Sequence, residues 1–171
     1  MRTSFVNHLT SALAVGVLAI LSQCSLKAQT LNTQPTYQLI KSTSLSNSAE
    51  TLTVQQTSTN NVSAGFEWVT VNCSAACVIA FSQNGTAATG TALTPTRINN
   101  SPPSQLTGYR SSNVGSGTTL SSFSLSSGLW TFDIRAFYIG GGGTAQNFSV
   151  SCTIATSGTC AITMQWKENP N

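Results

Sequence analysis

The stretch "FEWVTVNCSAACVIAFSQ", residues 66–83, decides the fold, because it holds two β-like runs around the closely spaced cysteines Cys73 and Cys77. If the chain reverses over the three small residues 74–76, each apolar residue of one run opposes an apolar residue of the other. These partners then share one face, as a strand with a single buried side requires. The stretch therefore predicts a hairpin closed by a Cys73–Cys77 disulfide, with these opposed pairs: Val71 with Ile79, and Val69 with Phe81.

The second cysteine pair, Cys152 and Cys160, shows the same pattern around a turn at residues 155–158. Directly opposed cysteines have Cα atoms ~4.5–5.5 Å apart, a distance that a disulfide can bridge. We therefore predict a second hairpin and the disulfides Cys73–Cys77 and Cys152–Cys160 in preference to the two crossed connectivities. Each would act as a local staple that contributes about 2 kcal/mol. The opposed pairs of the second hairpin are Val150 with Ile162 and Phe148 with Met164.

Residues 1–28 have the pattern of a secretory signal peptide. Arg2 precedes an apolar stretch at residues 9–21, which is shorter than the ~20 residues that span a bilayer. We expect cleavage after Ala28 and a secreted product, extracellular or periplasmic, with no membrane span. Cys24 is a rival site for a lipid anchor, but the bulky Gln23 before it argues against lipoprotein processing.

The residues around the remaining cysteines favour neither a metal site nor redox chemistry. The only histidine, His8, lies in the segment expected to be removed, so zinc would need four thiolates preserved in an oxidising compartment. "CSAAC" has three residues between its cysteines, whereas a thioredoxin-type pair has two and lies in a βαβ context. We predict no metal and no cofactor.

The composition indicates a folded extracellular protein with few charges. Hydrophobic residues make up 40% of the chain and charged residues 6%, and seven phenylalanines can supply a core. The basic residues that remain after cleavage are scattered singly, whereas nucleic-acid binding needs a clustered basic face. This excludes a nucleic-acid partner. The scattered basic residues are Lys41, Arg97, Arg110, Arg135 and Lys167.

The rest of the chain consists of short β-like runs separated by turn signals, with no helical periodicity longer than one or two turns. This pattern predicts an all-β protein, a single β-sandwich or jelly roll of about eight to ten antiparallel strands. We expect an N-terminal extension at 29–36, the domain at 37–168 and a tail at 169–171. The runs are 37–41, 50–56, 66–73, 77–83, 86–93, 106–111, 118–125, 129–139, 146–154 and 159–166.

The run at 129–139, "LWTFDIRAFYI", alternates strictly and predicts one long half-buried strand. Asp133 and Arg135 would lie on its outer face, where we expect a solvated ion pair worth at most ~1 kcal/mol. The core-facing residues would be Trp130, Phe132, Ile134, Ala136 and Tyr138. By the same parity Trp166 would point into the core.

The order of these runs resembles small jelly-roll structural proteins of tailed-phage virions. The phrases "SQNGTAATGTALTP" and "SSNVGSGTTLSSFSL", and the closing "AITMQWKE", carry this resemblance over residues 37–168. It implies a jelly roll that associates with copies of itself, commonly as trimers. The chain departs from such proteins in its signal peptide and its paired cysteines.

We expect the protein not to be an enzyme. A mature chain without histidine has no Ser-His or Cys-His nucleophile and no histidine general base. Glu67 would share a strand face with Val69 and Val71 and so point toward the core at a sheet end, or bond to Gln83. Catalysis by two carboxylates would have to use this set: Glu50, Glu67, Asp133 and Glu168.

Two functions fit these patterns. By parity Phe66 and Trp68 project from the outer face beside Val78 and Ala80 as an apolar patch, unless another segment covers it. The patch suits a structural or interaction module that self-associates as a homo-oligomer, which is our first prediction. It equally suits a carbohydrate-binding module that stacks aromatics on surface glycans. Tyr109 and Arg110, after a long loop, are further candidate ligand or interface residues.

Overall fold

The computed structural model describes residues 34–56, 62–83, 89–98, 101–113, 117–140 and 146–170, and these fold into strands. The predicted signal peptide, Cys24 and the cleavage site lie outside them. No helix in the described ranges is long and apolar enough to cross a membrane. The strands are β1 (Thr36–Gln56), β2 (Val62–Cys73), β3 (Cys77–Gln83), β4 (Thr89–Leu93), β5 (Thr96–Ile98), β6 (Thr107–Asn113), β7 (Thr118–Leu125), β8 (Gly128–Asp133), β9 (Tyr138–Ile139) and β10 (Gln146–Pro170).

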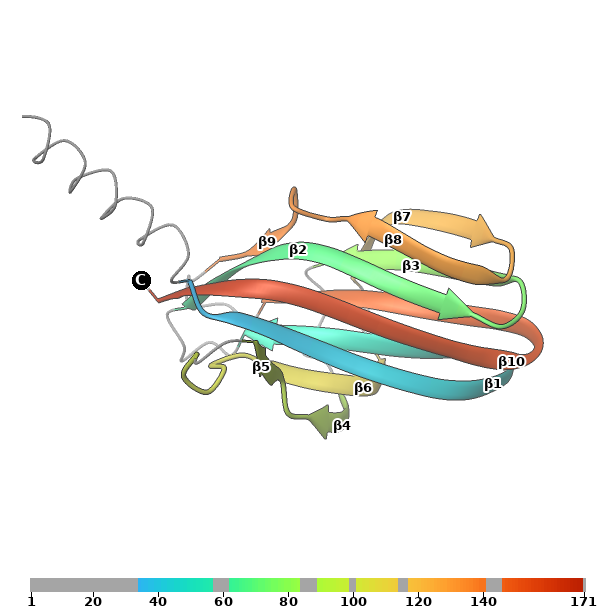
Figure 1. The fold of residues 1–171 in the computed structure, drawn as a ribbon, viewed down its shortest axis with the longest axis horizontal. Coiled ribbons are helices and arrows are strands. Elements are labelled where there is room, and N and C mark those ends of the chain that lie inside the picture. The colour runs from blue at the N-terminus through green and yellow to red at the C-terminus, as the bar shows by residue number, and fades with distance from the viewer. Residues whose placement is uncertain are drawn as a thin grey trace, which may run out of the picture. The chain divides into compact units, whose positions relative to one another are not determined.

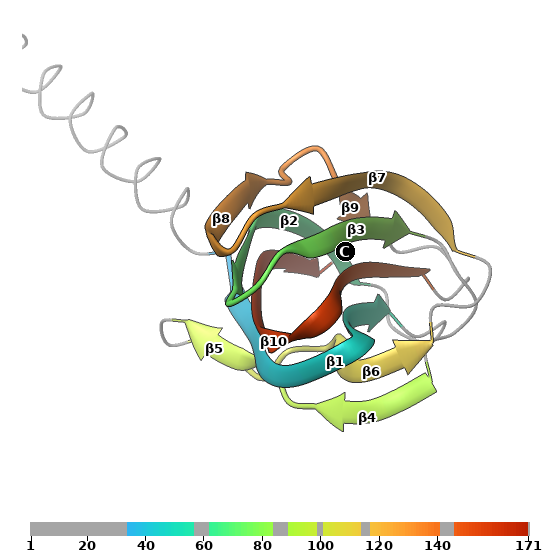
Figure 2. The same cartoon turned by 90° about the vertical axis from the view of Figure 1, so that its right-hand side faces the viewer.

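Two long strands, β1 and β10, pair along their length and bend back together, so each contributes to two layers (Figures 1 and 2). In the first layer, the early half of β1 pairs with the late half of β10, followed by β2 and β8. In the second layer, the late half of β1 pairs with the early half of β10, followed by β3 and β7. Two four-stranded sheets in this order form a jelly roll, which confirms the predicted fold class.

The remaining strands extend the two layers at their edges. β6 pairs with the late half of β1 and carries β4 outside it, while β5 pairs with the start of β1. β9 adds to the start of β2. Because β4, β5 and β6 lie between β3 and β7 in the chain, they form an insertion into the jelly roll.

The bend in β1 occurs at Asn47, which adopts a φ of 46° in the left-handed region that asparagine tolerates. The register with β10 shifts here, between Ser46 and Ser48, and the Ser46 N–H donates to Ser48 Oγ at 3.1 Å. The runs expected as separate strands at 37–41 and 50–56 are therefore one bent strand. The same holds for 146–154 and 159–166 in β10.

The predicted hairpin geometry is wrong for both cysteine pairs. Val71 pairs with Ile162 and Trp130 in the first layer, whereas Ile79 pairs with Cys152 and Phe123 in the second. The turns carry the chain from one layer to the other, so apolar residues face each other across the core instead of side by side. The alternation of apolar and polar residues fits a hairpin and a turn between layers equally well, because both arrangements bury one face of each strand.

The two predicted disulfides are nevertheless present, and each joins the two layers. Cys73 bonds to Cys77 and Cys152 to Cys160, with Cα separations of 6.4 and 6.7 Å. The Sγ atoms of Cys73 and Cys152 lie 3.8 Å apart, so both bridges form one cluster. They flank residues 74–76 and 155–158, where the chain passes from one layer to the other. Figure 1 shows the β2–β3 turn and the bend of β10 at the same end of the fold. The staples therefore connect sheets rather than close hairpins.

A hydrogen bond in β1 continues this line of cross-links. Thr43 lies beside Cys160, which lies beside Cys73, on three neighbouring strands of the first layer. Its Oγ1 donates to Oε2 of the buried Glu50 in the other half of β1, at 2.8 Å. Loop 74–76 packs closely over Gly158, where an added Cβ would lie 2.9 Å from Ser74 Oγ. All of these contacts hold the layers together at one end.

Aromatic side chains fill the middle of the core, and Phe66 is one of them at 2% exposure. Its ring centroid lies 4.3 Å from that of Phe148 in the opposite layer. Phe81 packs against Phe148 in turn, at 6.2 Å. Trp166 is fully buried as predicted. Rings from both layers therefore meet between the sheets.

The run at 129–139 is not one continuous strand. β8 ends at Asp133, a turn closed by the Phe137 N–H donating to the Ile134 carbonyl follows, and β9 is a short separate strand. Ile134 is buried as predicted, but Trp130 is 38% exposed and Tyr138 is 68% exposed. Trp130 is partly exposed because β8 is an edge strand, so this core-facing side chain has no neighbour on one side. Ala136 is exposed in the turn, and Tyr138 follows the turn on β9, where the alternation is reset and Ile139 is buried instead.

Candidate functional site

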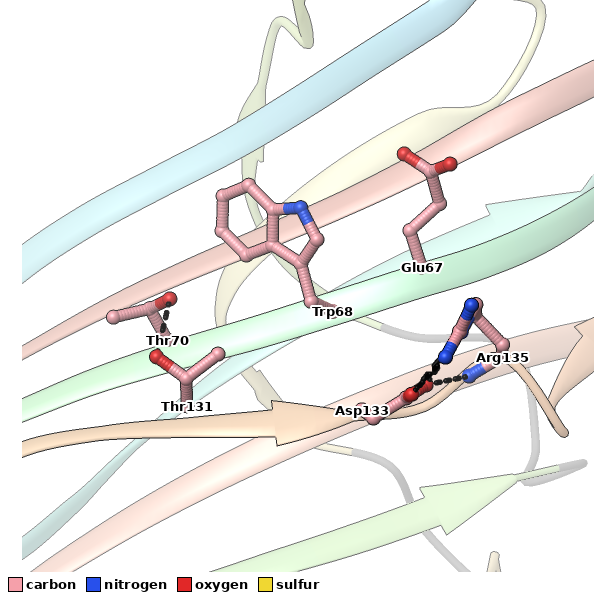
Figure 3. A pocket seen from close by; sticks show the side chains of 6 residues that line it. All are labelled: Glu67, Trp68, Thr70, Thr131, Asp133 and Arg135. Atoms are coloured by element: carbon pink, nitrogen blue, oxygen red, sulfur yellow. Dashed lines mark hydrogen bonds and ion pairs between the residues drawn. The ribbon is translucent and has the colours of Figure 1, made fainter.

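A β-bulge in β2 shapes the outer surface of the first layer. In β10, Gln165 pairs with Trp68 and the next residue, Trp166, pairs with Phe66, so Glu67 is an extra residue on β2. The bulge turns Phe66 into the core and leaves Glu67 and Trp68 side by side on the outer face (Figure 3). The predictions that Phe66 lies outside and that Glu67 points coreward are wrong for this reason.

Trp68 lines a shallow pocket of about 580 Å³ on this outer face. The indole is half-buried and stands beside Glu67, above the strands, while Asp133 and Arg135 lie across from it (Figure 3). The pocket therefore combines an aromatic surface with polar groups from β2, β8 and the turn that follows β8. Its lining residues are Glu67, Trp68, Thr70, Thr131, Asp133 and Arg135.

Glu67 is held by two neighbours on β10. Its Oε1 lies 2.6 Å from Lys167 Nζ, and its Oε2 accepts a short hydrogen bond from Gln165 Nε2. Burial raises the pKa of this carboxyl, but the hydrogen bonds and positive charges around it outweigh burial, so its pKa is lowered overall. Glu67 is therefore an ionised acceptor at neutral pH.

Asp133 and Arg135 form the solvated ion pair that the sequence predicted. The guanidinium Nη2 of Arg135 lies 2.5 Å from Oδ2 of Asp133, and the side chains of Arg135 and Asp133 are 76% and 59% exposed, respectively. Hydrogen bonds from Arg135 lower the pKa of Asp133 to about 2, and the partner carboxylate raises the pKa of Arg135. With Glu67 and Lys167, this part of the surface holds two acidic and two basic groups in balance.

Two threonine hydroxyls complete the pocket. Thr70 and Thr131 are opposite residues of β2 and β8, and their Oγ1 atoms lie 3.5 Å apart. Hydroxyls both donate and accept hydrogen bonds. In the alternation of each strand, Thr70 faces the same side as Trp68, and Thr131 the same side as Asp133. However, no local sequence pattern indicates that β2 and β8 are neighbours. Thr70 and Thr131 therefore cannot be recognised as neighbours from the sequence alone.

The other predicted ligand residues lie elsewhere. Tyr109 and Arg110 belong to β6, where Tyr109 pairs with Thr53 in the second layer. Val78 and Ala80 are on β3, also in the second layer. The apolar patch expected around Trp68 is therefore wrong, because its proposed members are in the core or in the other sheet. Trp68 has polar neighbours instead.

The described residues bring together one group of three potential metal ligands, the sulfurs of Cys73, Cys77 and Cys152. These atoms lie within 4.8 Å of one another. All three are bonded in disulfides, and a disulfide sulfur is not the thiolate that binds zinc. The cluster therefore serves as a cross-link in this state.

No family model matches the chain, and no curated protein sequence matches it. Among solved structures, it is similar to a Yersinia pseudotuberculosis-derived mitogen, at 3% identity and a TM-score of 0.34, over 74% of this chain and 83% of that one. It is similar to TmCBM61 in complex with β-1,4-galactotriose, at 9% identity and a TM-score of 0.22, over 81% and 66%.

A third similar structure is infectious bursal disease virus strain Gt, at 12% identity and a TM-score of 0.21, over 82% of this chain and 41% of that one. These scores are too low to carry an argument about function. They also do not confirm the resemblance to tailed-phage proteins.

Proposed function

We propose that this protein is a secreted module that binds neutral glycans, without cleaving them, in the pocket around Trp68. The observation that supports this best is the β-bulge, which puts a half-buried indole and an ionised carboxylate side by side on an open sheet face. The apolar face of a sugar ring stacks on an aromatic surface, while its hydroxyls need donors and acceptors around the rim. The pocket offers both.

The charges support binding rather than hydrolysis. A glycosidase needs one carboxyl group whose raised pKa keeps it protonated as a general acid. In this pocket the pKa values of Glu67 and Asp133 are both lowered, and each carboxylate has a basic partner. Neither is suited to donate a proton to a leaving group.

The proposal of secretion rests on the disulfides and on the predicted signal peptide. Two buried disulfides persist in oxidising compartments outside the cytosol. The pattern at residues 1–28 supplies a route to such a compartment.

Self-association is a second candidate, and the open edge of the sandwich favours it. Phe123 of β7 and Trp130 of β8 face the gap between the layers and are 41% and 38% exposed. In the part of the chain that the structure describes, β7 pairs with β3 alone and β8 with β2 alone. Such edges can pair with a second copy.

A glycan array followed by titration calorimetry tests the first proposal on residues 29–171. We expect binding to neutral oligosaccharides and a loss of about thirtyfold in affinity for Trp68→Ala, since truncation of a central aromatic costs about 2 kcal/mol. Leu129→Ala is the matched control, because Leu129 is 68% exposed on the same face and does not line the pocket.

An array without hits would reject glycan binding, whereas equal affinity for the wild type and Trp68→Ala would reject the pocket around Trp68 as the binding site. Sedimentation over a concentration series examines the second candidate on the same sample. A dimer or trimer that dissociates in Trp130→Ala would favour self-association through the edge.

Glycan binding should stay constant as the pH falls from neutral to the ordinary glutamate pKa of 4.5. Because the folded protein lowers the pKa of Glu67, its carboxylate stays ionised to below that value, and Asp133 stays ionised to about 2. The stability gained from Glu67 is likewise present above 4.5 and lost as the pH falls through the lowered pKa. Calorimetric titrations at several pH values measure this. A midpoint near pH 6 would contradict it.

A further inference from the structure

We propose that the binding surface continues from Trp68 along β2 to Tyr138, so that it takes a linear, neutral oligosaccharide rather than a single terminal sugar. This inference rests on the proposed function and names its ligand class. Three observations carry it: the position of Tyr138, the empty space above Gly65, and the balance of charge between the two aromatics.

Tyr138 lies on the same outer face as Trp68. It pairs with Gly65 of β2, and the next residue, Ile139, pairs with Ala64. Ile139 and Ala64 are buried in the core, so Tyr138 and Gly65 point to the outside. Tyr138 is 68% exposed, and its carbonyl accepts a hydrogen bond from Gln83 Nε2 at 2.6 Å, which fixes this short strand. A large aromatic ring is therefore presented to solvent at the far end of β2.

Gly65 leaves the surface between the two aromatics open. A Cβ added at Gly65 would meet no atom within 4 Å, so nothing fills the space above it. Its neighbour across the ladder is Lys167, whose Nζ is bound to Glu67. The path from Trp68 to Tyr138 therefore has an open floor with hydrogen-bonding groups along one side.

The length of this path sets the size of the ligand. Because Glu67 is the extra residue of the bulge, the ladder partners of Trp68 and Gly65, which are Gln165 and Lys167, lie only two residues apart on β10. This is roughly 7 Å at a rise of about 3.3 Å per residue. Tyr138 lies one strand further over, at a spacing of about 4.8 Å. This distance exceeds one sugar ring, so a ligand that stacks on both aromatics must be an oligosaccharide of about two residues or more.

The charge along the path favours a neutral chain. Glu67 is paired with Lys167 and Asp133 with Arg135, so each charged side chain already has its partner. An acidic or basic sugar would gain no net attraction from these pairs, whereas hydroxyls can share their hydrogen bonds. Binding should accordingly depend little on salt.

Calorimetry with chain-length series tests the inference. The probes are cello-, xylo-, manno-, chito- and β-1,4-galacto-oligosaccharides of one to six residues. For the series that binds, we expect affinity to rise with length to about two or three residues and then level off. Tyr138→Ala should weaken the hexasaccharide about tenfold without changing the monosaccharide, and Tyr138→Phe, which keeps the ring, should bind as the wild type does.

A second variant tests the floor. Gly65→Leu puts a side chain into the open path and should weaken the hexasaccharide to the affinity of the monosaccharide. Ser42→Leu is its matched control, because Ser42 is exposed on the outer face of β1, two strands away. Thermal unfolding of each variant checks that the fold is kept.

The outcomes separate the two proposals. If Trp68→Ala abolishes binding but affinity is independent of chain length and unchanged in Tyr138→Ala, the extended site is wrong and the glycan-binding function stands. If no series binds to the wild type, the glycan-binding function fails and the extended site fails with it.

Discussion

Replacing all four disulfide cysteines, Cys73, Cys77, Cys152 and Cys160, by alanine is expected to lower the free energy of unfolding by about 5 kcal/mol. Each bridge restricts the unfolded chain and is worth about 2–3 kcal/mol for loops of this length. A domain of ordinary stability has only about 5–15 kcal/mol in total. The four-cysteine variant should therefore be partly or largely unfolded at physiological temperature.

The location of the bridges adds to this expectation. Both join the two layers at the end where the chain turns from one to the other, with sulfurs of the two bridges 3.8 Å apart. Removing either bridge alone should cost about half of the total, and the losses should not be strictly additive because the sites are in contact. The hydrogen bond from Thr43 to Glu50 would be the cross-link left in this row.

Urea unfolding of the wild type, the two pair variants and the four-cysteine variant measures these losses. A total loss below about 1 kcal/mol would show that core packing alone holds the layers together. Non-reducing peptide mapping is the companion measurement. A peptide joining Cys73 or Cys77 to Cys152 or Cys160 would contradict the pairing itself.

The cysteine pairs were predictable from the sequence, although the geometry used to predict them was not correct. Spacing brings Cys73 near Cys77 whether the chain makes a hairpin or turns between two layers. In both cases the apolar residues of each strand share one face, so alternation gives the same pattern. The hairpin and the turn between layers differ only in which strands pair. In the structure, β10 lies beside β2, where the hairpin would have placed β3.

The strand content was predictable for a similar reason, since nearly every run of alternating residues is a strand. The bends were harder to see. Asn47 and the register shift beside it turn two expected strands into one. The short strand β5 lies within a segment interpreted as a loop, because its three residues have no periodicity to detect. The position of β8 at the edge of its sheet, which leaves Trp130 partly exposed, likewise depends on which strands pair and not on the local sequence.

The candidate site was predictable only in part. Trp68 was expected on the outer face and lies there, whereas its partner Phe66 does not. One inserted residue, Glu67, changes the parity of everything before it in β2, and a bulge has no reliable signature in a single sequence. Thr131 and Asp133 meet Trp68 through strand pairing between distant segments. Local patterns thus predict which residues are outward, while the site depends on which strands are adjacent.

The last prediction follows from the bulge and contrasts the effects on stability of replacing Phe66 and Trp68, which belong to consecutive pairs of the ladder. Phe66→Ala should lower the free energy of unfolding by about 3–5 kcal/mol, because Phe66 is 2% exposed and its loss leaves a cavity against Phe148. Trp68→Ala should lower it by about 1 kcal/mol or less, because the half-buried indole faces solvent over the outer side of the sheet.

Urea unfolding of the two variants beside the wild type provides the comparison, and Phe66→Leu serves as a control that keeps most of the buried volume. Glycan affinity should respond in the opposite order, falling in Trp68→Ala and remaining in any folded fraction of Phe66→Leu. If the two alanine variants lost equal stability, β2 would have regular alternation at Glu67 and both rings would share a face. Glu67 would then point away from Trp68, and the pocket would lack the pairing of indole and carboxylate on which the proposed function depends.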